Sequence, residues 1–369
     1  MCSKIKNLSE TIVKYSLKVK ENDKVLITSG STRTNELVKE LIKQIVEEKG
    51  IPFVRYVDAD IDSLLTELTD QNRIEEMKKH KQFDVDHYDC FINIRYLTND
   101  YVSKNVPSII RKKIGEAIEK IDDIRINNRR WVLLNYPSHL DAYKAKMTNE
   151  EFENYAFDVM NVDYAAMREM VKPLKELMEK TDKVRIVAPN TDITFSIKDI
   201  PVIPCCGTAN IPDGEIYTAP VKDSVNGIIT YNTPSPYQGN VFNNVSLTFE
   251  NGKIVECNCN GDNQKLEEIF DTDEGARYIG EFAIGLNPMI LDPMGDILFD
   301  EKIIGSIHFT PGRAYKDAFN GNKSAIHWDM VLIEREEYGG GELYFDDQLV
   351  RKNGIFVLPE LEHLNYDLK

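Results

Sequence analysis

The chain has 369 residues, of which 42% are hydrophobic and 29% charged, so it has the composition of a globular protein and enough length for two domains. Its formal net charge of −16, from 61 acidic and 45 basic residues, argues against a nucleic-acid partner, because phosphate contacts require Lys and Arg. The first residues lack the apolar segment of a signal peptide, and no stretch approaches the ~20 apolar residues of a membrane span. We therefore expect a cytoplasmic protein with no membrane partner and, since its six cysteines form no CxxC pair, with free thiols.

The first third of the chain predicts a βαβ unit. Residues 24–28 have the pattern of a buried strand, 36–49 that of an amphipathic helix, and 53–57 that of the next strand. Ser9 is in a position to cap an earlier helix, and a further strand is expected at 90–94. Strands that alternate with helices favour a parallel sheet.

The pattern changes in the second part of the chain. Helices are expected at 149–160 and 163–180, the second of them interrupted at Pro173, because proline lacks the backbone donor that a helix interior needs. From Lys183 onward, short alternating strands are separated by Gly, Asn, Asp and Pro, which is typical of antiparallel sheets.

These patterns predict two domains. The first is an α/β N-terminal domain with a parallel-type sheet over residues 1–128. The second is an α+β domain, rich in antiparallel strands, over residues 129–369, in which the candidate site residues described below all lie.

A histidine and an aspartate share one face of a predicted strand. Residues 324–331 have the pattern of a strand, in which residues i and i+2 point to the same side, so His327 and Asp329 should project together. An imidazole nitrogen and a carboxylate oxygen suit zinc, cobalt or manganese. Taken alone, the pair is a weak signal, and a simple hydrogen-bonded pair is the more common explanation.

A second histidine, His308, lies in another predicted strand, residues 305–309. That strand runs into a Pro-Gly turn, which we expect to fold Tyr315 back toward His308.

Two glutamates occupy unusual settings. Glu215 lies between glycine and proline residues that indicate a tightly shaped loop leading into a short strand. Glu281 is the one acid in an otherwise apolar segment, and burying an acid is costly unless it is paired or bound to a metal. The alternative is that each glutamate lies at a surface edge.

Four segments together resemble the aminopeptidase T family of metallopeptidases, which includes the aminopeptidase S enzymes. The family pattern has a glutamate before a "TAP" phrase, then "LGE", then a histidine seven residues before a tyrosine, then HxD. The matching phrases here, in the same order, are IPDGEIYTAP, YIGEFAIG, IHFTPGRAY and IHWD.

The resemblance implies a metal-dependent aminopeptidase that removes the N-terminal residue of short peptides, and a homodimer. It implies two divalent ions, for which zinc, cobalt, manganese and magnesium are the candidates, with Glu281 as the bridge between them. Two such ions can activate a shared water and polarise the scissile carbonyl. Tyr315 would donate a hydrogen bond to the developing oxyanion. The implied metal ligands are Glu215, Glu281, His308, His327 and Asp329.

The chain departs from the family pattern in two places. The link from His308 to His327 is shorter than is usual in the family. The family also has a glutamate in an "FDEN" phrase shortly before its first histidine, whereas this chain has Phe299-Asp300-Glu301-Lys302 followed by extra residues. Glu301 is therefore a sixth candidate ligand.

Two other functions remain open from the sequence. A mononuclear Fe(II) ring-cleaving dioxygenase on the same fold would need only two histidines and one carboxylate, which His308, His327 and Asp329 supply. A non-catalytic metal-binding relative is the other alternative. The glutamate pair separates the dioxygenase from the peptidase, because a one-iron site needs neither Glu215 nor Glu281. Loss of a ligand or of Tyr315 would favour the non-catalytic relative, and none is lost in this sequence.

Overall fold

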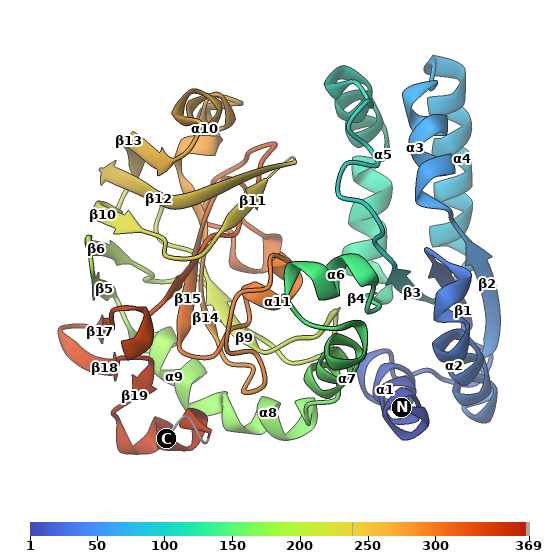
Figure 1. The fold of residues 1–369 in the computed structure, drawn as a ribbon, viewed down its shortest axis with the longest axis horizontal. Coiled ribbons are helices and arrows are strands. Elements are labelled where there is room, and N and C mark those ends of the chain that lie inside the picture. The colour runs from blue at the N-terminus through green and yellow to red at the C-terminus, as the bar shows by residue number, and fades with distance from the viewer. Residues whose placement is uncertain (238, 367–369) are drawn as a thin grey trace. The chain divides into compact units, whose positions relative to one another are not determined.

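Figure 1 shows the computed structural model of the chain, which describes residues 1–237 and 239–366. The chain divides into a first unit of Met1–Asn161 with Gly207–Pro212, and a second unit of Val162–Cys206 with the residues from Asp213 onward. This division differs from the expected boundary at 128/129, because the strand that follows residue 129 pairs within the sheet of the first unit.

The first unit contains the predicted parallel sheet, in the strand order β2-β1-β3-β4-β8, and every pairing in it is parallel. Its strands are β1 (Lys24–Ser29), β2 (Ile51–Tyr56), β3 (Cys90–Arg95), β4 (Arg130–Asn135) and β8 (Asn210–Ile211). Its α-helices are α1 (Cys2–Glu10), α2 (Asn35–Glu47), α3 (Ala59–Glu67), α4 (Gln71–His87), α5 (Ser108–Asn128), α6 (His139–Lys144) and α7 (Asn149–Met160). The chain returns to this sheet through β8, long after leaving it.

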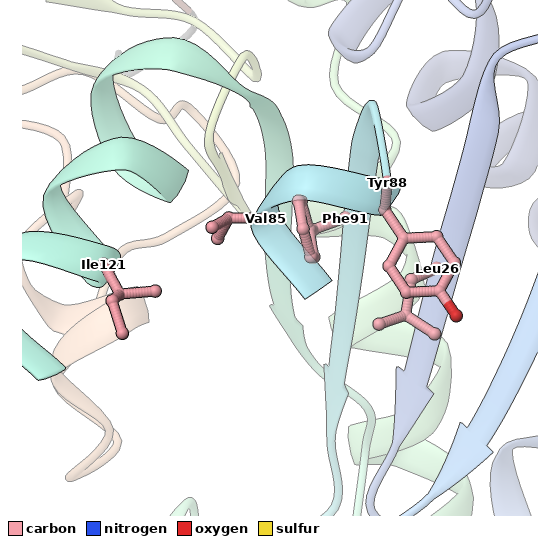
Figure 2. Close-up of a cluster of buried hydrophobic side chains, with 5 residues drawn as sticks. All are labelled: Leu26, Val85, Tyr88, Phe91 and Ile121. Carbon is pink, nitrogen blue, oxygen red and sulfur yellow. The ribbon is translucent and has the colours of Figure 1, made fainter. Parts of the chain in front are cut away.

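Apolar side chains from strands and helices form the core of this unit, as Figure 2 shows for one cluster. The cluster consists of Leu26 from β1, Phe91 from β3, Val85 from α4, Tyr88 directly after α4, and Ile121 from α5. None of the five is more than 8% exposed. Burial of side chains from both kinds of element explains why the alternating pattern of the sequence closes into one layered unit.

The prediction that Ser9 caps a helix is wrong. Helix α1 already begins at Cys2, and Ser9 is buried inside it, where its hydroxyl donates a hydrogen bond to the carbonyl of Ile5. A π-helical turn over Thr11–Ser16 then continues the helix. A serine within a helix often bonds to the carbonyl four residues back, and the sequence pattern alone does not separate this arrangement from a cap.

The second unit is dominated by two antiparallel sheets, in agreement with the predicted α+β class. The nine-stranded sheet has the order β11-β12-β10-β6-β5-β17-β18-β19, with β13 paired to β12. Its strands are β5 (Lys183–Ala188), β6 (Thr191–Ser196), β10 (Asn226–Thr230), β11 (Ser235–Tyr237), β12 (Asn240–Glu250), β13 (Lys253–Asn260), β17 (Glu342–Phe345), β18 (Gln348–Lys352) and β19 (Ile355–Phe356).

The five-stranded sheet has the order β16-β15-β14-β9-β7. Its strands are β7 (Ile203–Cys205), β9 (Glu215–Thr218), β14 (Ile279–Gly285), β15 (Ser306–Pro311) and β16 (Val331–Ile333). Every residue of β9, β14, β15 and β16 is buried, so polar side chains on these strands are held inside the protein. This sheet carries three of the predicted site residues, Glu215, Glu281 and His308.

The helices of the second unit are α8 (Tyr164–Met170), α9 (Lys172–Lys180), α10 (Asn263–Phe270) and α11 (Ile297–Asp300). The predicted interruption at Pro173 is confirmed, since α8 ends before it and α9 begins with it in the first turn, where proline is tolerated. None of the helices in the described part of the chain combines the length and apolar character that a membrane crossing requires.

The segment that carries His327 and Asp329 is extended but is not the predicted strand over 324–331. Only Val331–Ile333 forms a ladder, and His327 makes one isolated bridge to Gly312. Gly312 has φ +107°, and a side chain there would lie 2.2 Å from the carbonyl oxygen of Ile326. Glycine therefore permits the close approach that places His327 beside β14 and β15.

Candidate metal centre

Glu281 lies at the centre of the site, in the middle of β14, and is 3% exposed. Its Oε1 is 3.2 Å from Nε2 of His308, and its Oε2 is 3.4 Å from Nε2 of His327. The two oxygens of one carboxylate thus face two different histidines, which is the arrangement that a bridging ligand requires. The surface-edge alternative for Glu281 is excluded.

Both histidines are oriented by their other ring nitrogen. Nδ1 of His308 lies 3.1 Å from the carbonyl oxygen of Glu301, and Nδ1 of His327 lies 2.7 Å from that of Arg313. A carbonyl accepts a hydrogen bond, so each Nδ1 carries the hydrogen and each Nε2 is directed at the carboxylates. Metal-binding histidines are typically held in this way.

Two more carboxylates complete the cluster. Glu215, at the start of β9, places Oε2 3.5 Å from Nε2 of His308. Asp329 places Oδ1 3.3 Å from Nε2 of His327 and accepts a hydrogen bond of 2.7 Å from the hydroxyl of Thr310. The prediction that His327 and Asp329 project together is therefore confirmed, even though the segment is not part of a ladder.

The described residues offer three groups of potential ligand atoms. Two of them share Glu281, one with Glu215 and His308 and the other with His327 and Asp329, and the third consists of Cys205, Asp213 and Glu215. Within each group these atoms lie within 4.8 Å of one another. Oε2 of Glu215 and Oε2 of Glu281 are buried and make no well-aligned hydrogen bond within the described residues. Their neighbours are the Nε2 atoms of His308 at 3.5 Å and His327 at 3.4 Å. Buried carboxylates beside imidazole nitrogens are a donor set that fits divalent ions.

Glu301 belongs to none of these groups. Its Oε1 is 2.6 Å from Nζ of Lys302, a residue that the sequence patterns did not single out. Lys302 is 0% exposed, and its Nζ is also 2.7 Å from Oε1 of Glu215. Burial alone would lower the pKa of Lys302, but the charges of Glu215 and Glu301 outweigh it and raise the pKa, so the ammonium keeps its proton. Burial raises the pKa of Glu301 to about 8 despite the neighbouring ammonium.

Tyr315 borders the cluster on the side of His327. The two ring centroids are 4.7 Å apart, and the ring of Tyr217 contacts Tyr315 at 5.8 Å. We expected the turn after β15 to direct Tyr315 toward His308, but its ring packs against His327. Tyr315 is 43% exposed, so a molecule that approaches from solvent can reach it. Desolvation by the surrounding protein, followed by the charge of Glu281, raises the pKa of Tyr315, which keeps its hydroxyl a donor.

The charge of the cluster predicts that metal binding releases protons. Burial lowers the pKa of His308, but the hydrogen bond with Glu281 and the charge of Glu215 outweigh it and raise the pKa to about 9. A metal binds only the neutral imidazole, so the chelated protein must lose a proton from His308 at pH 7. Metal affinity should therefore increase as the pH rises toward about 9, by up to about tenfold per pH unit for each proton displaced.

Calorimetric titration of the chelated protein in buffers with different ionisation enthalpies measures this proton release directly. The same affinity at pH 6 and pH 8 would contradict the assignment of His308 as a ligand.

The donor set suits divalent metal ions, and the family to which the chain belongs agrees with it. The chain belongs to the M29 family of thermophilic metalloproteases, whose family pattern matches residues 1–355. The resemblance that the sequence motifs suggested is thereby confirmed.

Several named relatives match parts of the chain. Aminopeptidase AmpS of Bacillus subtilis is 35% identical over 127 residues, which are 33% of this chain and 30% of that protein. Aminopeptidase T of Thermus thermophilus is 33% identical over 153 residues, 37% of each chain. Aminopeptidase PepS of Streptococcus thermophilus is 23% identical over 314 residues, 71% of this chain and 76% of that protein. The matches to AmpS and aminopeptidase T thus cover about a third of those relatives' length.

Two solved structures share the fold over almost the whole chain. AmpT from Thermus thermophilus superposes with a TM-score of 0.76 at 18% identity, covering 96% of this chain and 99% of its own. The 2,5-dihydroxypyridine dioxygenase from Pseudomonas putida KT2440 superposes with a TM-score of 0.64 at 15% identity, covering 98% and 99%. At these identities the likeness concerns the fold, so the reaction must be argued from the site.

Proposed function

We propose that the protein is an aminopeptidase that uses two divalent ions to hydrolyse the N-terminal peptide bond of short peptides. The observation that supports this most strongly is Glu281, whose two oxygens face His308 and His327 separately. One ion would be held by Glu215, Glu281 and His308, and the other by Glu281, His327 and Asp329. The names of the relatives, all aminopeptidases, agree with this proposal.

The ions would supply an activated water at neutral pH and polarise the scissile carbonyl. The residues of the chain perform the other tasks. Tyr315 borders His327 and keeps its proton, so it can donate a hydrogen bond to the oxyanion that forms as the carbonyl is attacked. A carboxylate of the cluster would hold the proton that the attacking water loses.

The negative charge of the cluster would also attract the positive α-amine of a peptide. A free amine bound there would confine cleavage to the first peptide bond. A metal-loaded protein should therefore release the first residue of a short peptide with a free amine and leave the N-acetylated form of the same peptide intact. Mass spectrometry of the products tests this, and equal cleavage of the two peptides, or cleavage at internal bonds, would contradict an aminopeptidase.

The dioxygenase alternative is less well supported. An iron site made of His308, His327 and Asp329 would leave Glu215 and Glu281 without a role, yet both contact the histidines. Oxygen uptake by the iron-loaded protein with dihydroxylated aromatic compounds, together with inactivity on peptides, would favour that alternative.

The finer parts of the proposal come from the family resemblance. They are zinc, cobalt, manganese or magnesium as the ion, a homodimer as the assembly and the cytoplasm as the location. Metal analysis of the purified protein and light scattering coupled to size exclusion would test the first two.

A further inference from the structure

Lys302 places a permanent positive charge inside the cluster of candidate metal ligands. It follows α11, is 0% exposed, and forms ion pairs with Glu215 at 2.7 Å, Glu301 at 2.6 Å and Asp213 at 3.8 Å. Burying an ammonium is costly unless carboxylates surround it, and three of them do so here. Lys302 is therefore a buried cation with defined carboxylate partners, and not a surface lysine.

Glu215 connects this ammonium to one of the two metal groups. Its Oε1 pairs with Lys302, while its Oε2 faces His308 and accepts no hydrogen bond within the described residues. A cation that binds Oε2 of Glu215 is consequently separated from the ammonium by a single carboxylate. Two positive charges so close together repel strongly in a buried site, where little solvent screens them.

An ion at the other metal group, Glu281 with His327 and Asp329, would be repelled less by Lys302. Of the ion pairs that Lys302 makes with described residues, none involves His327, Asp329 or Glu281. Asp329 is instead stabilised by the hydroxyl of Thr310, which carries no charge. The two groups thus share Glu281 but differ in having a fixed cation at one of them only.

We propose that Lys302 makes the two metal positions unequal. The ion at Glu215, Glu281 and His308 is bound weakly and exchanges, whereas the ion at Glu281, His327 and Asp329 is bound tightly. Lys302 acts as a positioning residue that holds Glu215 and Glu301 and sets the affinity of the weaker position. This inference rests on the proposed two-metal function. It adds that the concentration of free metal determines whether the weaker position is occupied.

The test is a calorimetric titration of the chelated protein with Zn²⁺, supported by the absorption spectrum of a parallel Co²⁺ titration. We expect two separate binding steps in the wild type. In Lys302→Met, which keeps the length of the side chain but removes its charge, the weaker step should tighten by at least about tenfold while the tighter step stays unchanged. The matched control is Lys352→Met, which removes a surface lysine from an ion pair with Glu342 and should leave both steps as in the wild type.

A double variant, Glu301→Gln with Lys302→Met, replaces the buried pair of Glu301 and Lys302 with two neutral side chains. It removes the ammonium without leaving Glu301 as a buried acid, so it also carries the test if Lys302→Met alone does not fold. The weaker step should still tighten, because the ammonium next to Glu215 is gone.

An unchanged or weaker second step in both variants would overturn the inference about Lys302, as would two equal steps in the wild type. If the wild type bound no divalent ion at all, the proposed function itself would fail. The two failures are therefore distinguishable.

Discussion

Replacing Glu281 by glutamine should abolish peptidase activity and lower metal content together. The amide keeps the shape of the side chain but removes the charge, and its nitrogen is a poor ligand for a divalent ion. Since Oε1 and Oε2 of Glu281 face His308 and His327 separately, both metal groups lose a ligand at once. We expect the metal affinity to fall by at least about 100-fold, since losing even an outer-shell partner of a metal site typically costs 10- to 100-fold. Metal analysis after dialysis, together with hydrolysis of aminoacyl chromogenic substrates, measures both effects.

The control is Glu250→Gln, which removes one exposed acid of the same unit outside the cluster. It should retain full activity and full metal content. A Glu281→Gln protein that retained full activity and full metal content would contradict the assignment of Glu281 as the bridging ligand.

The second large effect is expected for Tyr315→Phe. The ring contact with His327 would survive, but the hydroxyl that we propose as the oxyanion donor would be lost. Loss of one such donor typically lowers kcat by about 10²- to 10³-fold. Because Tyr315 belongs to neither metal group, the variant should bind as much metal as the wild type.

Tyr344→Phe serves as the matched control, because it removes a phenol hydroxyl that donates to Glu342 on the nine-stranded sheet. Its kcat should remain unchanged. If Tyr315→Phe raised KM and left kcat intact, Tyr315 would bind the substrate without stabilising the transition state.

The predictable part of the site rested on local patterns. Alternation in a strand directs i and i+2 to one face, and this sufficed to place His327 beside Asp329. Glu281 stood out because an acid in an apolar segment needs a partner when buried, but the pattern left a surface edge equally open, and the family resemblance decided between them. In the structure it has two histidine partners. The parallel and antiparallel halves of the fold followed in the same way from the strand and helix periods.

Other features depended on contacts between distant segments. Strand β8 returns to the parallel sheet through two residues, which is too short a segment for any periodicity to reveal. The extended segment around His327 looked like a full strand, but a period-2 pattern cannot show whether a neighbouring strand is present to pair with it.

Lys302 could not be predicted because its partners come from elsewhere in the chain. Its own segment contains Glu301, but Asp213 and Glu215 precede it by more than eighty residues. A lysine next to an acid usually lies in solvent, and nothing local distinguishes this one. Only the fold brings the three carboxylates around the ammonium.

The most direct test of the two-metal account is a stepwise reconstitution. The protein is stripped with a chelator and titrated with zinc, cobalt or manganese, while bound metal per chain and release of the N-terminal residue are followed together. The account predicts no activity in the stripped protein and full activity only as the second ion per chain is bound. Activity that survives complete removal of metal, or that reaches its maximum at one ion per chain, would contradict it.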